Sequence, residues 1–130
     1  MKKSIVVIAA AGILFFLFSC TPHEQQLQQK NIKMLSQGEL EQIFRADRTA
    51  KTTLPMGSYV VKYYSDGRQE VDYGRGLDTG KFRIQGNQFC SSWKMRRAGE
   101  EECTKFYKVG ENSYELIRKD GSLVGTWVFN

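Results

Sequence analysis

Two cysteines, Cys90 and Cys103, are the side chains of this 130-residue sequence best placed for covalent chemistry with each other. They flank the polar segment 96–101 (RRAGEE), which contains the glycine that a turn needs. A hairpin folded at this segment sets the two cysteines opposite each other on neighbouring strands, within disulfide distance. The pattern predicts a Cys90–Cys103 disulfide. The alternatives are two free thiols or a metal pair, and the metal site lacks further ligands because His23 is the only histidine.

The third cysteine, Cys20, ends a segment typical of an export signal. Residues 1–3 carry positive charge, and residues 5–18 (IVVIAAAGILFFLF) are an unbroken apolar run, which is short for a bilayer span. Residues 17–20 (LFSC) resemble the lipobox of bacterial lipoproteins. The resemblance implies a signal peptide at 1–19, lipid on Cys20, and, because Thr21 rather than aspartate follows, an anchor in the outer membrane on its periplasmic side. The alternative is an ordinary signal peptide or anchor with a chance cysteine. An exported protein meets the oxidising conditions that the disulfide requires.

Charge and composition exclude several functions. Lys2 and Lys3 leave with the signal peptide, so 17 of the 19 basic residues remain against 14 acidic ones, a net charge of +3. This charge is not gathered in a basic stripe with interleaved aromatic residues, so nucleic acid is not an expected partner. The glycine-rich segment 74–80 is not followed by a helix, which argues against a phosphate-binding loop. We expect no cofactor and no metal.

No set of residues has the spacing of a catalytic site. The acidic run 100–102 sits at a hairpin tip and is typical of a solvated loop, and His23 lies close to the anchor. Asp66, Asp78 and Asp120 are interpreted as turn formers, because aspartate stabilises turns through local hydrogen bonds. Catalysis needs an acid or base in a tuned environment, so the sequence predicts that the protein is not an enzyme.

Behind the anchor we expect a flexible tether over 20–34 and then one domain over 35–130. Ser36 and Glu39 form a capping-box pattern at the start of a helix of about three turns that ends near Asp47. Leu40 and Phe44 share one face of it with Ile43, and we expect this face to cover one end or face of a sheet.

From residue 57 onward the pattern is that of β-strands joined by tight turns. A three-residue loop with Gly67 in the left-handed region and a two-residue turn at 86–87 bring apolar residues onto a shared face. They predict four opposed pairs: Val61 with Val71, Tyr59 with Tyr73, Ile84 with Phe89, and Gly80 with Trp93. The sequence therefore predicts a mainly β fold, an antiparallel meander of about seven strands in a small closed or half-open barrel, with one short N-terminal helix.

The β region also resembles a family of small secreted bacterial domains of unknown function with a lipocalin-like (calycin) architecture. That family has an aspartate-glycine hairpin, a glycine-x-aromatic strand, a cysteine-x-x-tryptophan strand and a second cysteine. The matching positions are Asp66, Gly67, Gly80, Phe82, Cys90, Trp93, Cys103 and Tyr107. Phe82 stands where the family usually has tryptophan. The resemblance implies a fold and no particular activity.

The aromatic residues are the remaining functional signal. Four of them are candidate ligand-binding residues at a barrel mouth: Tyr59, Tyr73, Trp93 and Trp127. The alternative is that they only fill the interior of a small barrel. We expect a non-catalytic protein-interaction module of the cell envelope, held at the membrane by the Cys20 lipid and binding an envelope protein. The alternatives are a lipocalin-like binder of a small apolar ligand, or an inhibitor of an envelope or foreign hydrolase.

Overall fold

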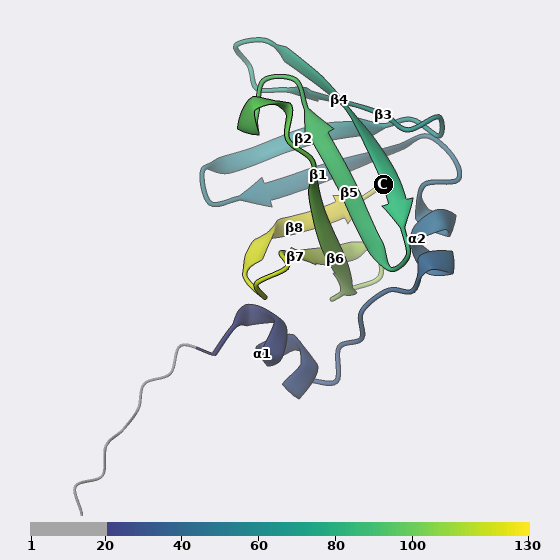
Figure 1. The fold of residues 1–130 in the computed structure, drawn as a ribbon, viewed down its shortest axis with the longest axis vertical. Helices are drawn as coiled ribbons and strands as arrows, with labels where there is room; N and C mark the ends of the chain where they lie inside the picture. The colour runs from purple at the N-terminus through teal and green to yellow at the C-terminus, as the bar shows by residue number, and fades with distance from the viewer. Residues whose placement is uncertain (1–20) are drawn as a thin grey trace, which may run out of the picture.

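The computed structural model describes residues 21–130, so the predicted signal peptide and the lipidation site at Cys20 lie outside the described residues. Eight antiparallel strands form a closed barrel in which each strand pairs with its neighbours in sequence and β8 pairs back with β1 (Figure 1). The strands are β1 Arg48–Leu54, β2 Gly57–Tyr63, β3 Arg68–Asp72, β4 Leu77–Gln85, β5 Gln88–Trp93, β6 Glu102–Lys108, β7 Ser113–Ile117 and β8 Leu123–Phe129. The helices are α1 His23–Gln29, α2 Gln37–Ile43 and the short 3₁₀ turn η1 Arg97–Gly99. The mainly β, barrel-forming prediction is confirmed.

The strand that the sequence did not reveal is β1, and it is the strand that closes the barrel. Its inward residues include Ala50 and Thr52, which are 0% and 2% exposed. Neither is large and apolar, so the alternation of buried and exposed positions does not show as an alternation of hydrophobicity. The Thr52 hydroxyl donates to the Tyr59 carbonyl of β2 at 3.2 Å, which satisfies its hydrogen bonding inside the barrel.

The turns set the register that the sequence predicted. Val61 pairs with Val71, Ile84 with Phe89, and Gly80 with Trp93. The fourth pair, Tyr59 and Tyr73, lies beyond the paired residues of β2 and β3, but the two rings meet edge to face with centroids 5.0 Å apart. Gly67 has φ +93°, in the left-handed region that the three-residue loop requires.

Helix α2 closes one end of the barrel. It has the expected capping box, with the Glu39 backbone N–H donating to Ser36 Oγ and the Ser36 N–H donating to the Glu39 carboxylate, but it ends at Ile43, after about two turns. Leu40 and Phe44 are buried beneath it. The Phe44 ring lies with its centroid 4.9–6.1 Å from five other rings, those of Tyr63, Phe82, Phe89, Phe106 and Phe129.

The segment before α2 is not a free tether. Residues 23–29 form α1, whose Leu27 is 3% exposed and packs with Tyr107 and Ile117 on the outside of the barrel. Met34 forms a β-bridge with Tyr107. The glutamine-rich composition concealed this docking because a single apolar residue, Leu27, carries most of the buried face. Within residues 21–130, no helix has the length and apolar character needed to cross a membrane.

Candidate functional site

The barrel encloses a cavity of about 270 Å³. All four aromatic residues that the sequence singled out line it: Tyr59 from β2, Tyr73 after β3, Trp93 from β5 and Trp127 from β8. They reach the same space because alternate residues of every barrel strand point inward. The structure therefore brings the candidate residues together, and their role in binding a ligand stays a prediction.

The cavity has a closed end and an open end. Its floor includes Tyr63 and Phe89, two of the rings that contact Phe44 below α2. Its mouth lies at the opposite end, where β5 and β7 finish and where β6 and β8 begin. The residues around the mouth include Leu54, Trp93, Arg96, Arg97, Glu100, Glu102, Arg118 and Val124.

Three arginines stand at this mouth, and two of them are paired. Arg97 forms an ion pair with Glu102, and Arg118 Nε lies 3.5 Å from the second carboxylate oxygen of Glu102. Arg118 also donates to the Leu123 carbonyl at 2.9 Å. The half-buried Arg96 has no hydrogen bond or ion pair from its side chain to any residue of the described chain. A guanidinium that lines a cavity without a partner is suited to an anionic group.

The cavity wall also carries one unsatisfied polar atom. Gln69 on β3 is 1% exposed, and its Nε2 donates to the carbonyls of Lys81 at 3.3 Å and Ser92 at 3.1 Å. Its Oε1 is buried and accepts no hydrogen bond within residues 21–130. Leaving a buried acceptor unpaired costs about 1–3 kcal/mol, and because this oxygen has almost no exposed surface, a donor in the cavity reaches it only if the wall rearranges.

The other buried polar groups of the interior are mostly paired. Trp127 Nε1 donates to the Tyr63 hydroxyl at 2.7 Å, and the Thr104 hydroxyl donates to the Phe89 carbonyl at 3.3 Å. Burial raises the pKa of Tyr63 far above its ordinary value, with the Trp127 hydrogen bond opposing it weakly, so this phenol stays protonated.

Gly80 makes the Gln69 arrangement sterically feasible. A Cβ at this position would lie 2.0 Å from the Ser92 carbonyl oxygen and 3.1 Å from Gln69 Nε2. Because Gly80 has no side chain, the Gln69 amide has space to reach from β3 past β4 to the Ser92 carbonyl of β5. The glycine of the predicted glycine-x-aromatic strand thus has a steric role beside the cavity.

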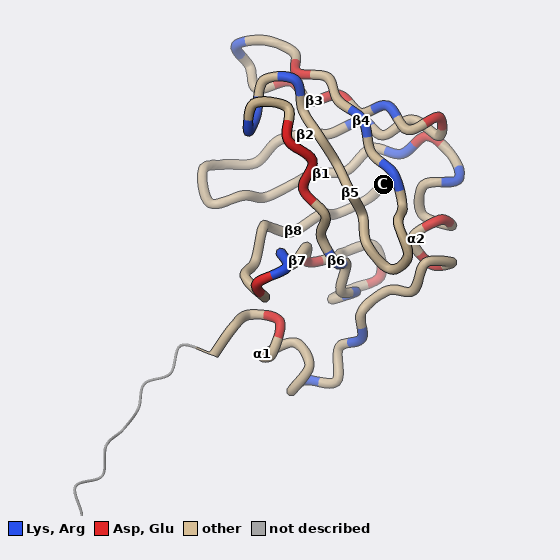
Figure 2. Tube along the Cα trace, in the orientation of Figure 1, with Lys and Arg blue, Asp and Glu red and all other residues tan. Residues whose placement is uncertain are grey.

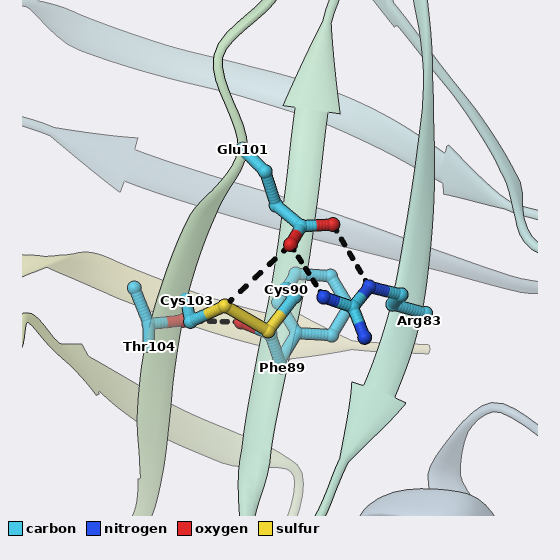
Figure 3. Close-up of a disulfide and its surroundings, with 6 residues drawn as sticks. All are labelled: Arg83, Phe89, Cys90, Glu101, Cys103 and Thr104. Carbon is cyan, nitrogen blue, oxygen red and sulfur yellow. Dashed lines mark hydrogen bonds and ion pairs between the residues drawn. A yellow bond between two sulfur atoms is a disulfide. The ribbon is translucent and has the colours of Figure 1, made fainter.

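The cysteine pair lies on the other face of β5 from the cavity, because Phe89 and Ser91 point inward. The Cys90 and Cys103 sulfur atoms are 2.08 Å apart, at disulfide distance, and Cys90 is 0% exposed. Glu101 lies over the pair and receives two hydrogen bonds from Arg83, at 2.6 and 2.9 Å (Figure 3). Arg83 lowers the pKa of Glu101, mainly through these hydrogen bonds. Glu101 and the two sulfurs are close enough to hold a cation, but sulfurs bonded to each other are not the thiolates that metals bind.

The acidic run is therefore only partly a solvated loop. Glu100 is exposed, whereas Glu101 and Glu102 pair with arginines. Asp66 and Asp120 accept backbone N–H bonds in turns, as the sequence predicted. Asp78 departs from that interpretation, because it is 1% exposed on β4 and accepts from the Met95 N–H at 3.3 Å, which ties the connection after β5 to the barrel.

Sequence reasoning missed the polar contacts that hold α1. His23 pairs with Glu115, and Glu24 accepts from Lys105 Nζ at 2.8 Å and from the Tyr107 hydroxyl at 2.6 Å. Burial alone would raise the pKa of Glu24, but the two hydrogen bonds and the Lys105 charge outweigh it, so this pKa is lowered. Burial and the Glu24 contact raise the pKa of Tyr107 to about 12. These partners are more than 80 residues apart in sequence, so no local pattern could have revealed them.

His23 is therefore held on the outer face of β7, away from the cavity.

Comparisons of the chain with protein-family models, with curated proteins and with solved structures found no match. The functional assignment consequently depends on the cavity and on the sequence signals alone.

Proposed function

We propose that this protein is an outer-membrane lipoprotein, anchored through Cys20, whose barrel binds a small amphipathic molecule. The observation that carries the proposal is the cavity of about 270 Å³, which has an aromatic wall and an unpaired guanidinium at its mouth. Small-molecule sites are usually concave and mainly apolar, and this cavity shares the concave form and the aromatic wall, although nine of its twenty lining residues are polar or charged. The cavity favours this role over the protein-interaction role that the sequence alone suggested.

The lining specifies the chemistry of the ligand. Apolar and aromatic side chains such as Val61, Tyr59 and Trp127 suit a hydrocarbon or ring system. Arg96 suits a carboxylate or another anionic head group at the mouth. The volume is slightly below the roughly 300–1,000 Å³ of most ligand pockets, so the ligand is compact.

The architecture supports the lipocalin-like resemblance as part of the proposal. Lipocalins are eight-stranded up-and-down barrels, and barrels of this strand number hold one small ligand. The order of strands here is the same simple meander, closed between β1 and β8.

A titration followed by intrinsic fluorescence tests the proposal, because Trp93 and Trp127 both line the cavity. Straight-chain alkanoates from hexanoate to dodecanoate are the probes. Each added methylene that enters the cavity contributes about 0.8 kcal/mol, or roughly fourfold in affinity. The affinity should rise with chain length and stop rising when the cavity is full.

A matched pair of arginine variants tests the head-group contact. Arg96→Gln should weaken alkanoate binding by roughly tenfold or more, since a hydrogen bond to a charged group is worth about 1.5–3 kcal/mol, and should leave binding of the corresponding alcohol unchanged. Arg75→Gln, in the exposed β3–β4 connection, is the control. Absence of any fluorescence response, together with native mass spectra showing no retained small molecule, would overturn the proposal. Equal effects of the two variants would overturn the role of Arg96.

A further inference from the structure

The described chain begins at the open end of the barrel. Pro22 lies against Gly121 of the β7–β8 turn, and the Glu24 N–H donates to the Gly121 carbonyl at 3.0 Å. This turn follows Arg118, which lines the cavity mouth. Figure 1 shows α1 beginning on the same side of the barrel as η1 and the β1–β2 hairpin, with α2 at the other side. Thr21, which follows Cys20 in the sequence, therefore lies at the same end of the barrel as the mouth.

Large apolar side chains are exposed on three separate connections around the same end. Met56 in the β1–β2 turn is 68% exposed, Leu77 at the start of β4 is 58% exposed, and Met95 after β5 is 80% exposed. Single exposed apolar residues are ordinary on protein surfaces, but these are the three most exposed large apolar residues of the described chain, and all lie at one end of the barrel. At the closed end, the apolar residue of the β6–β7 connection, Val109, is only 37% exposed.

Basic residues accompany the apolar ones. Arg75 and Lys94 are exposed beside Leu77 and Met95 in sequence, and Figure 2 shows the basic positions on the β3–β4 connection and around η1. Of the acidic residues that begin β6 or precede it, Glu101 and Glu102 are neutralised by arginines. Asp72, Glu100 and Asp120 are also exposed at this end and form no ion pair within residues 21–130, so the unpaired groups there are of both signs.

We propose that the open end of the barrel docks on a lipid bilayer. Met56, Leu77 and Met95 enter the boundary between head groups and acyl chains, and the cavity mouth faces the membrane. The proposal rests on the proposed acylation of Cys20, which would fix the lipid at the same end of the barrel. The exposed apolar side chains of this rim add to the membrane affinity that the acyl anchor provides. A ligand that partitions into lipid then reaches the cavity without crossing water.

Two tryptophan reporters test the orientation in the acylated mature protein. Met95→Trp places the reporter on the rim, and Asn87→Trp places a matched one in the exposed β4–β5 turn at the α2 end. Both are incorporated in vesicles of phosphatidylglycerol and phosphatidylcholine whose acyl chains carry bromine, a fluorescence quencher. Protein with only the native tryptophans provides the background. The added emission of Met95→Trp should be quenched several-fold more than that of Asn87→Trp.

Further variants identify the cause of the quenching. Met56→Ser with Leu77→Ser, in the Met95→Trp background, should reduce quenching, whereas Val109→Ser should leave it unchanged. Equal quenching of both reporters, or stronger quenching of Asn87→Trp, would overturn the orientation. No quenching of either would overturn docking on lipid altogether. Mass spectrometry of the same sample reports acylation of Cys20, and the alkanoate titration without vesicles reports ligand binding, so each proposal can fail separately.

Discussion

Replacing Phe44 by alanine is the sharpest test of how the closed end of the barrel is built. The side chain is 6% exposed and its ring contacts five other aromatic rings. Truncating a buried phenylalanine costs about 3–5 kcal/mol through lost burial and the cavity left behind. This is a large share of the roughly 5–15 kcal/mol that stabilises most domains. Because Tyr63 and Phe89 separate Phe44 from the cavity, the change should also deepen the cavity.

Urea unfolding followed by tryptophan fluorescence measures the loss. With a slope of about 2 kcal/mol per molar urea, the midpoint should fall by roughly 2 M. Phe44→Leu should lose less because it keeps most of the buried volume, and it remains measurable where the alanine variant fails to fold. Gln42→Ala, on the exposed side of the same helix, should change stability by no more than about 0.5 kcal/mol. If Phe44→Ala or Phe44→Leu were as stable as this control, the interpretation that α2 closes this end of the barrel through Phe44 would be wrong.

The other predictions concern the disulfide, the barrel interior, the α1 contacts and the lipid anchor. Replacing Cys90 and Cys103 by serine should lower the free energy of unfolding by about 3 kcal/mol, as for a closed loop of this size, and a non-reduced digest of the native protein should contain the two peptides linked. Gly80→Ala should destabilise the barrel by about 1–3 kcal/mol in urea unfolding, because of overpacking. The lowered pKa of Glu24 means that its stabilising contribution is present above the ordinary value of 4.5 and is lost as the pH falls through the lower folded value. The protection of α1 amides against hydrogen exchange, measured relative to the intrinsic exchange rate at each pH, should therefore fall only in acid, and in Glu24→Gln it should be low at every pH. Cys20→Ala should abolish acylation and release or stall the protein, as fractionation would show.

Each of these predictions has an outcome that contradicts it. Free thiols in freshly purified material would exclude the disulfide. A Gly80→Ala variant as stable as Gly38→Ala, where no atom lies within 4 Å of the added methyl group, would contradict the steric argument. Equal protection of the α1 amides at neutral and acid pH, relative to the intrinsic exchange rate at each pH, would show that the Glu24 contacts do not hold the helix. A processed and membrane-bound Cys20→Ala protein would refute lipid anchoring at that residue.

The parts of the fold that the sequence predicted are those set by local chemistry. The Ser36–Glu39 capping box, Gly67 in its turn and the pairing of Val61 with Val71 follow from residues close together in the chain. The closure of the barrel did not, because β1 turns the small residues Ala50 and Thr52 inward. In a meander, the pairing of the first and last strands joins the residues that lie furthest apart in the sequence. The inward residues of β1 need fill only the space that larger neighbouring side chains leave.

The candidate site was predictable in kind but not in detail. Tyr59, Tyr73, Trp93 and Trp127 were identified because aromatic side chains are numerous for a small barrel, and all four line the cavity. The role of Gln69 was not visible, since a glutamine in a strand of mixed polarity is typical of an exposed position. Its burial depends on Gly80 and on the carbonyl of Ser92, which come together only after three strands have paired.

One end of the barrel is packed with aromatic side chains, and the other contains the mouth of the cavity. At the α2 end, the Phe44 ring cluster fills the barrel interior with aromatic side chains, and the Arg48 guanidinium lies 5.5 Å from the centroid of one of these rings, Phe129. The cavity opens at the other end, where the charged residues Arg96, Glu102 and Arg118 surround the mouth. The Glu24 contacts fix α1 so that the chain also enters there. On the proposals made above, anchoring, ligand entry and head-group recognition all occur at one end, which leaves the closed end free to be optimised for packing alone.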